Sequence, residues 1–232
     1  MKISDLYIVA LIPARSGSKG IPHKNIKLYK NKPLLVHSID VALKCEYIKE
    51  IYVSTDSEEY QNIAINNGAL VTPLRPPDIS DDLSPDIDTF LYFIKIFKKI
   101  PDLIIHLRPT YPNRNINILN DCINKFIENY ENYDSLRTVV KIDKTPYKMY
   151  HIDNNNLIPY INTYKNLIEP FNQARQHFPD TYLHNGCIDI IKTKLIVNKN
   201  LLSGEKIYPY IMNENEIDDI DSINDFNKSE NK

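Results

Sequence analysis

Short apolar runs alternate along the chain with segments whose apolar residues recur at the spacing of a helix. The runs are predicted to be strands, because they last four to six residues and are rich in Ile, Val, Leu and Tyr; they lie at 7–12, 51–55, 69–72, 103–107, 136–140, 188–191 and 207–212. Apolar residues share one helical face after Pro33 (35–43), at 87–97 and at 119–127. Strands separated by such helices predict βαβ units, and hence an α/β domain built on a mainly parallel sheet.

The alternation stops between Lys141 and Leu183, where Tyr, Asn and Pro are frequent and neither period is sustained. Long irregular segments inside compact domains often serve as lids or partner contacts. We therefore expect an α/β domain formed by 1–140 and 184–232, with 141–183 as an inserted subdomain that serves as a lid or a partner contact.

Composition narrows the class of protein without indicating a chemistry. The chain has 232 residues, 28 Lys and Arg against 30 Asp and Glu, and a formal net charge of −2. This balance gives no general reason to expect a nucleic acid or a membrane as partner. The N-terminal apolar run ends at Pro13, well short of the ~18 apolar residues of a membrane span. Cys45, Cys122 and Cys187 are too scattered for a disulfide framework or a zinc site, so we expect a cytoplasmic protein.

The loop predicted after the first strand concentrates glycine and positive charge. Its sequence, PARSGSKGIPHKN (13–25), holds two of the five glycines of the chain, Gly17 and Gly20, together with Arg15, Lys19 and Lys24. Ligands of open α/β sheets bind at the carboxyl ends of strands. Glycines let backbone N–H groups approach a phosphate, and Arg and Lys balance its charge. The loop is neither a Walker A motif nor G-x-G-x-x-G, which disfavours a dehydrogenase. It predicts a triphosphate site, with a solvated basic turn as the alternative.

The loop also resembles the opening motif, R-S-G-S-K-G-I-P-x-K-N, of the acylneuraminate (CMP-sialic acid) cytidylyltransferases. Five further blocks resemble motifs of this family in the same order: VSTDSEEY (53–60), LRPPDISDD (74–82), LRPTYPNR (107–114), ARQHFPDTYLHNGCIDI (174–190) and IMNENEIDDIDS (211–222). The resemblance implies a Rossmann-like nucleotidyltransferase fold, a three-layer sandwich. It implies transfer of CMP from CTP to an acidic 2-keto sugar, with release of pyrophosphate. It also implies Mg²⁺ or Mn²⁺ as cofactor and a homodimer formed through 141–183.

On the nucleotide side, charged residues of the loop support the prediction most directly. Arg15 and Lys24 are the candidates for holding the triphosphate and stabilising its charge during transfer; Lys19 is a weaker one. With the positions that the resemblance implies, the predicted nucleotide-binding residues are Ala14, Arg15, Gly17, Ser18, Lys24, Asn25, Arg75 and Asp82. Arg75 has an alternative role, a surface salt bridge to Asp78 or Asp81.

Asp219 and Asp221 are the predicted metal ligands and, with Arg15 and Lys24, the predicted catalytic residues. In an extended segment, residues i and i+2 project to the same face, so two carboxylates can meet one hard cation. Such a cation would lower the repulsion between phosphates and an acidic acceptor. The alternative is a helix cap, because DSINDF (221–226) can begin a helix with Asp221 or Ser222 as N-cap. Asp218 is left outside the predicted site.

On the sugar side, the resemblance implies substrate binding by Arg108, Thr110, Lys148, Arg175 and Asn185. Asn185 and the glycine after it resemble a turn at the floor of the family's pocket. An Asn-Gly pair is also a common tight turn in proteins of any function.

Three departures from the family pattern fall on this sugar side. Arg108 stands where the family usually has glutamine, Asp189 where an aromatic residue is usual, and TPYKMY (145–150) where a P-F-W-like sequence is frequent. Arg108 therefore either faces an acceptor that differs from N-acetylneuraminate or turns away and pairs with an aspartate. Legionaminic, pseudaminic and other nonulosonic acids stay open as acceptors, and so does the base of the nucleotide.

Other functions fit parts of the same pattern. A metal-dependent glycosyltransferase also uses D-x-D, although usually after a mid-chain strand rather than at 219–221. Transfer of another nucleotide to another small acceptor would need the same residues. A nucleotide-binding regulator without catalysis would be expected to lack Arg15, Lys24 or an aspartate, and all are present. No histidine is assigned as a general base.

Overall fold

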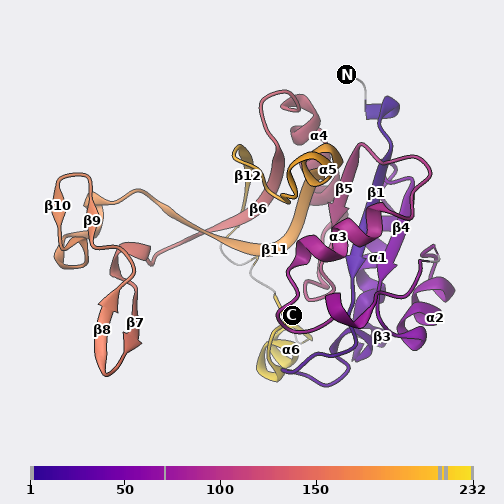
Figure 1. Ribbon diagram of the computed structural model, residues 1–232, viewed down its shortest axis with the longest axis horizontal. Coiled ribbons are helices and arrows are strands. Elements are labelled where there is room, and N and C mark those ends of the chain that lie inside the picture. The colour runs from indigo at the N-terminus through magenta and orange to yellow at the C-terminus, as the bar shows by residue number, and fades with distance from the viewer. Residues whose placement is uncertain (1–2, 71, 214–215, 217–218, 231–232) are drawn as a thin grey trace. The chain divides into compact units, whose positions relative to one another are not determined.

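The computed structural model describes residues 3–70, 72–213, 216 and 219–230 (Figure 1). The chain forms two compact units. The main unit comprises Met1–Thr138, Asn185–Tyr210 and Asp218–Lys232, and the second unit comprises Val139–His184 and Ile211–Ile217. Val71 of the predicted strand 69–72, and Glu214, Asn215, Ile217 and Asp218 of the closing motif, lie outside the described residues.

In the described chain, six strands form one sheet in the order β12-β6-β11-β5-β1-β4. Their bounds are Ile8–Pro13 (β1), Glu50–Ser54 (β4), Leu103–His106 (β5), Ser135–Ile142 (β6), Thr181–Lys192 (β11) and Ile207–Met212 (β12). β1 runs parallel to both β4 and β5, whereas β11 runs antiparallel to β5, with Asp189 opposite His106. Parallel pairs predominate among these pairings, so the predicted α/β class with a mainly parallel sheet is confirmed.

The α-helices of the described chain are α1 (Leu34–Leu43), α2 (Glu58–Asn66), α3 (Asp86–Ile94), α4 (Ile116–Glu128), α5 (Thr193–Lys199) and α6 (Ile223–Glu230). α1 begins directly after Pro33, and α3 and α4 lie in the other two segments predicted from helical spacing. The spacing did not predict α2, which buries only Tyr60 and Ala64, nor the seven-residue α5. Both apolar stripes are too short to give a periodic signal.

The core of the main unit forms on both faces of the sheet. Val9 and Leu11 of β1 lie in one buried cluster with residues of α3 and α5, namely Phe90, Phe93 and Ile196. Figure 1 shows α3 crossing the strands on that face. Ile8 and Ala10 point the opposite way and are also fully buried. Strands buried on both faces give the continuous apolar runs seen in the sequence.

α6 begins within the predicted segment DSINDF. Ser222 Oγ accepts a hydrogen bond from the Asp225 N–H at 3.2 Å, and Asp225 Oδ2 accepts one from the Ser222 N–H at 2.9 Å. This reciprocal pair is a capping box, so the prediction of a cap is confirmed, at Ser222. Phe226 then packs with Ile220 and Ile21 in a small buried cluster, which holds the segment 219–221 beside the loop that follows β1.

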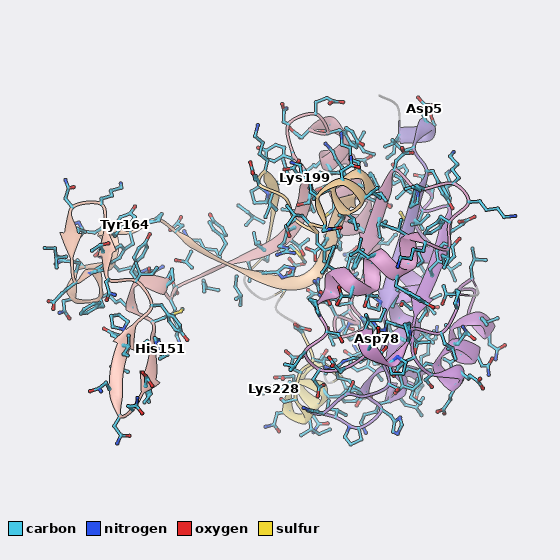
Figure 2. The ribbon with its side chains drawn as sticks, in the orientation of Figure 1. Asp5, Asp78, His151, Tyr164, Lys199 and Lys228 are labelled. Carbon is cyan, nitrogen blue, oxygen red and sulfur yellow. The ribbon has the colours of Figure 1, made fainter. Side chains whose placement is uncertain are left out.

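The second unit contains regular structure in a segment where the sequence sustains neither the helical nor the strand period. β7 (Tyr150–Asp153) pairs antiparallel with β8 (Asn156–Pro159), and β9 (Thr163–Tyr164) pairs with β10 (Leu167–Ile168). Figure 2 labels His151 of β7 and Tyr164 of β9. The turn between β7 and β8 has positive φ at both Asn154 (46°) and Asn155 (64°), as two-residue hairpin turns require. These strands are largely exposed, so they lack the alternation that predicts a half-buried strand.

A second two-residue turn of the same kind lies in the main unit. Lys30 (φ 46°) and Asn31 (φ 64°) join β2 (Leu28–Tyr29) to β3 (Lys32–Pro33). These strands are two residues long and were not predicted.

The predicted strand 69–72 is wrong as well, in its described part. Leu70 makes only an isolated parallel bridge with Tyr52, through its N–H to the Ile51 carbonyl at 2.8 Å. Pro73 follows almost at once and cannot donate a backbone hydrogen bond, so it cannot extend the ladder. None of the helices in the described chain is both long enough and apolar enough to cross a membrane.

Candidate functional site

A cavity of about 440 Å³ opens in the main unit at the carboxyl ends of β1 and β5. Ligands of open α/β sheets bind at this edge. Three loops and one carboxylate surround the cavity: the first loop (14–25), the second loop (74–85), the turn 106–110, and Asp221. Figure 2 labels Asp78, an exposed residue of the second loop.

The first loop is held in shape by hydrogen bonds within the loop and by hydrogen bonds to Asp56, which follows β4. Ser16 donates to Asp56 through its N–H at 2.7 Å and through its hydroxyl at 2.9 Å. Asn25 is buried and donates through Nδ2 to the Arg15 carbonyl at 2.9 Å. The predicted nucleotide-binding residue Asn25 therefore also fixes the loop that carries Arg15.

Asp82 of the second loop joins two cations of the first loop. Its Oδ1 lies 2.6 Å from Arg15 Nη2, and its Oδ2 pairs with Lys19 Nζ. Hydrogen bonds from Lys19 and Arg15 hold the pKa of the Asp82 carboxyl below its usual range. An entering phosphate would compete with this carboxylate for the same two side chains.

Lys24 connects the first loop to the chain end that carries the predicted metal ligands. Its Nζ donates to the Ile220 carbonyl at 2.7 Å and lies 3.3 Å from Asp221 Oδ1. Gly20 lies at the same junction, and a Cβ added there would come within 2.6 Å of the Asp221 carbonyl oxygen. A Cβ at Gly17 would meet nothing within 4 Å. Packing against Asp221 therefore explains why position 20 needs a glycine. The close approach of a phosphate to either glycine stays a prediction.

Asp219 is a partly buried carboxylate at the end of the chain segment that also carries Asp221. Its Oδ1 is buried and has no hydrogen-bond partner among the described residues, and such groups in native proteins often face an ion. Burial raises the pKa of Asp219, a hydrogen bond from Thr110 lowers it, and the charge of Asp221 raises it. The two carboxylates fit Mg²⁺, which takes one or two protein carboxylates and fills its other positions with water and phosphate. Within the described chain no cluster of three or more His, Cys, Asp or Glu could hold a metal.

Arg75 is buried, so the alternative of a surface salt bridge is wrong. Its Nε donates to Ser80 Oγ at 3.1 Å and its Nη1 to Thr89 Oγ1 at 2.7 Å. Its Nη2 is buried without a hydrogen-bond partner among the described residues. Burial lowers the pKa of this guanidinium, yet Arg stays charged at neutral pH. Arg75 lines the cavity and can offer Nη2 to a ligand oxygen.

Arg108 pairs with Asp189, as one of the two alternatives for this residue predicted. Its Nη1 donates to Asp189 Oδ2 at 2.7 Å, and Arg137 donates through Nε to Asp189 Oδ1 at 2.9 Å. The two residues that depart from the family pattern at 108 and 189 thus pair with each other. Arg108 nevertheless lines the cavity, next to Thr110.

Arg114 is a positioning residue that the sequence did not single out. It is buried and donates to the Cys187 carbonyl at 2.6 Å, to Ser38 Oγ at 2.8 Å and to the Arg108 carbonyl at 2.5 Å. Burial lowers the pKa of its guanidinium. These bonds fix the turn that presents Arg108 and Thr110.

Asn185 and Gly186 lie inside β11 rather than in a turn, so both turn interpretations were wrong. Asn185 is buried, and its Oδ1 accepts a hydrogen bond from Thr138 Oγ1 at 2.7 Å. Gly186 has a φ of 70°, and a Cβ added there would lie 3.5 Å from Asp219 Oδ2. Gly186 therefore lies beside the Asp219 carboxylate, and the Asn185 bond links β11 to Thr138 of β6.

The structure brings most of the predicted main-unit residues to one cavity. The predicted residues among its lining are Arg15, Ser18, Lys24, Asn25, Arg75, Asp82, Arg108, Thr110 and Asp221. Within the described chain, Ala14, Gly17, Asn185 and Asp219 are not part of this lining. Lys148 and Arg175 belong to the second unit, where Arg175 pairs with Asp143 at 2.8 Å.

Several lining residues were not predicted as site residues: Pro13, Ile79, Asp81, Ser84, Asp86, Thr89, His106 and Pro109. They come from the end of β1, the second loop, α3, the end of β5 and the turn after β5. No local pattern identifies them, because only the packing of the loops assembles them.

Comparisons with known proteins concern the family and the fold of the chain. A family model described as cytidylyltransferase matches residues 9–156. The N-acylneuraminate cytidylyltransferase of Escherichia coli O18:K1:H7 is 28% identical over 219 residues, which is 94% of this chain and 50% of that protein. The CMP-N,N'-diacetyllegionaminic acid synthase of Legionella pneumophila is 40% identical over 112 residues, 47% of this chain and 48% of that protein. The chain thus spans about half the length of the Escherichia coli relative.

A pseudaminic acid cytidylyltransferase of Campylobacter jejuni serotype O:2 matches over nearly its full length, at 27% identity over 220 residues, 94% of this chain and 92% of that protein. Among solved structures, a CMP:2-keto-3-deoxy-manno-octonic acid synthetase complexed with CTP superposes with a TM-score of 0.72 at 14% identity, covering 97% of both chains. At that identity the likeness concerns the fold, which is the Rossmann-like architecture expected from the sequence.

Proposed function

Because the chain belongs to the cytidylyltransferase family, we propose that it transfers CMP from CTP to the anomeric hydroxyl of an acidic 2-keto sugar and releases pyrophosphate. The observation that supports this most directly is the cavity itself. Cations of the first loop line one part of it, and the carboxylate of Asp221 lies beside Lys24 at its edge. A triphosphate and a divalent cation are the ligands that such a pairing of charges suits.

In this proposal the first loop binds the triphosphate. Arg15 and Lys19 exchange Asp82 for phosphate oxygens, and Lys24 reaches the oxygens nearest the carboxylates. Arg75 offers its buried Nη2 to the nucleotide. Fixed cations stabilise the charge that develops on the phosphates, since they need no reorganisation during the reaction.

Asp219 and Asp221 would hold Mg²⁺ or Mn²⁺. When bound, the cation supplies Lewis-acid stabilisation of phosphate charge and reduces its repulsion with an acidic acceptor. The anomeric oxygen of the acceptor forms a bond to the α-phosphorus while the bond to pyrophosphate breaks. The hydroxyl proton leaves to water or to an aspartate, and Lys24 stays placed beside the transferred phosphate.

The acceptor class is supported by the names of the relatives, which act on N-acylneuraminic, N,N'-diacetyllegionaminic and pseudaminic acids. Arg108 adds a positive charge to the cavity wall, in agreement with an acidic acceptor. Thr110 lies next to Arg108, and its side chain already bonds Asp219. These two residues are proposed to face the sugar. For Lys148 and Arg175 of the second unit, substrate binding stays a prediction from the family resemblance.

Two further features belong to the proposal. We expect a homodimer formed through 141–183, on the basis of the family resemblance and of the exposed aromatic and apolar residues there, such as Tyr160 and Ile168. A strictly monomeric mass in light scattering at micromolar concentration would contradict it. We also expect a cytoplasmic enzyme, supported by three buried cysteines that form no disulfide.

The test is pyrophosphate release with Mg²⁺, crossing CTP, GTP, UTP and ATP with N-acetylneuraminic, N,N'-diacetyllegionaminic and pseudaminic acids. We expect activity with CTP and at least one acid, and a loss of about 10²-fold or more in Asp221→Asn, the size typical of a removed electrostatic group. Asp78→Asn is the matched control, because it changes an exposed aspartate outside the cavity lining. The proposal would be contradicted if the unsubstituted protein, the parent of these variants, released no pyrophosphate with any substrate pair. Full activity of Asp221→Asn would contradict it as well.

A further inference from the structure

Two arginines share one buried aspartate next to the cavity: Arg108 belongs to the cavity lining, whereas Asp189 and Arg137 do not. The Asp189 side chain is 3% exposed, whereas those of Arg108 and Arg137 are 23% and 30% exposed. Each oxygen of Asp189 takes one guanidinium, with Arg108 Nη1 at 2.7 Å and Arg137 Nε at 2.9 Å. The three side chains form what we term the Arg–Asp–Arg network.

The sheet places this network. Arg137 lies on β6, Asp189 on the neighbouring β11, and Arg108 two residues after the end of β5, the next strand in the sheet. His106 stands opposite Asp189 in the β5–β11 pair, with its Nδ1 at 3.7 Å from Asp189 Oδ2. Charged side chains that stand on strands and are held by a buried partner lose little conformational freedom when a ligand binds.

The charges of the network do not cancel. One carboxylate faces two guanidinium groups, so the three side chains together carry a net positive charge. Asp86 approaches Arg108 Nη2 at 3.6 Å, but its side chain is 56% exposed and beyond hydrogen-bond distance, so it compensates Arg108 weakly. Guanidinium groups present several N–H donors in a fixed plane and suit a carboxylate.

We infer that Arg108 and Arg137, positioned by Asp189, bind the carboxylate of the acceptor and thereby select an anionic acceptor. The inference rests on the proposed function and names the residues that set its acceptor specificity. The triphosphate is the other possible source of anionic oxygens, but it already has Arg15, Lys19 and Lys24 on the first loop. The experiment below separates the two sources by measuring both substrates.

The experiment compares Arg137→Gln, Arg137→Lys and Asp189→Asn in the full chain. It measures KM for CTP, KM for the best acid of the substrate grid, and the affinities of that acid and of its methyl ester by calorimetry. We expect Arg137→Gln to weaken binding of the acid about ten-fold or more, since a hydrogen bond to a charged group contributes at least that factor. KM for CTP and the affinity of the neutral ester should change less than about two-fold, and Arg137→Lys should restore part of the loss.

Asp189→Asn tests the positioning role. It keeps the shape of the side chain but removes the charge that holds both guanidinium groups, so the acid should again weaken while CTP does not. If this variant does not fold, Arg137→Gln still tests the inference. The Arg137 side chain is partly exposed, so its substitution is less damaging to folding than that of buried Asp189. Lys199→Gln is the control for a lost positive charge: Lys199 is exposed at the end of α5, away from the cavity lining (Figure 2).

The outcomes distinguish the inference from the proposed function. If the parent transfers CMP to an acid and Arg137→Gln binds that acid as tightly as the parent, only the inference fails. The inference would also be overturned if Arg137→Gln raised the KM for CTP and left the KM for the acid unchanged, because Arg137 would then contact the triphosphate. If the parent releases no pyrophosphate but binds the acid through Arg137, the proposed transfer fails and the inference stands. A parent that binds none of the acids overturns both.

Discussion

Gly20→Ala is expected to damage both folding and activity, because Gly20 is where the backbone of Asp221 meets the first loop. A Cβ at this position would lie 2.6 Å from the Asp221 carbonyl oxygen. Ordinary contact begins at 3.4 Å, so the two segments must move apart by 3.4 − 2.6, or about 0.8 Å. The obstructing atom is backbone and cannot rotate away as a side chain would.

The displacement has two measurable consequences. Overpacking of this kind costs about 1–3 kcal/mol, which corresponds to a drop of about 2–12 °C in melting temperature for a chain of this size. Asp221 would also move relative to Lys24, and a misplacement of about 1 Å at reacting groups can cost about 10²-fold in rate. Thermal melts and the pyrophosphate assay measure the two effects separately.

Gly17→Ala is the matched control for the stability measurement. It lies in the same loop, but a Cβ there meets nothing within 4 Å, so its melting temperature should stay within about 1 °C of the parent, as for most surface substitutions. The reasoning is refuted if Gly20→Ala melts and turns over like the parent. It is also refuted if Gly17→Ala lowers the melting temperature as much as Gly20→Ala does.

Three further predictions concern charged groups of the site. Asp82→Asn should tighten CTP binding several-fold in calorimetry, because Arg15 and Lys19 lose the carboxylate that competes with phosphate; weaker binding would mean that Asp82 itself contacts the nucleotide. Arg114→Lys should lower the free energy of unfolding by about 2–4 kcal/mol in denaturant melts, since an ammonium cannot reach the three acceptors that the guanidinium satisfies; an unchanged midpoint would contradict this. Burial raises the pKa of Asp219, so its contribution to stability is present below the ordinary pKa of an aspartate and is lost as the pH rises through the raised value. Asp219→Asn should therefore melt higher than the parent at pH 7 without metal, and Mg²⁺ should stabilise only the parent; equal stabilisation of both by Mg²⁺ would place the cation elsewhere.

The sequence by itself determined the α/β class and the place of the cavity. Strands buried on both faces and helices with one apolar stripe leave local periodicities, and these predicted β1, β4, β5, α1, α3 and α4. The cations and glycines of the first loop follow β1 directly, so chain order alone put them at the carboxyl edge of the sheet. Exposed hairpins such as β7–β8 escaped prediction, because a strand without a buried face leaves no alternation.

Only the tertiary structure decided how the site is assembled and which roles its residues share. Gly20 meets the backbone of Asp221, 201 positions later. Arg108 pairs with Asp189, 81 positions away. The buried guanidinium of Arg75 donates a hydrogen bond to Thr89. In each of these contacts, the way helices and loops pack on the sheet decides which residues meet. Local patterns carry no information on such distances, because the free energy of a long-range contact depends on which surfaces the whole fold buries together.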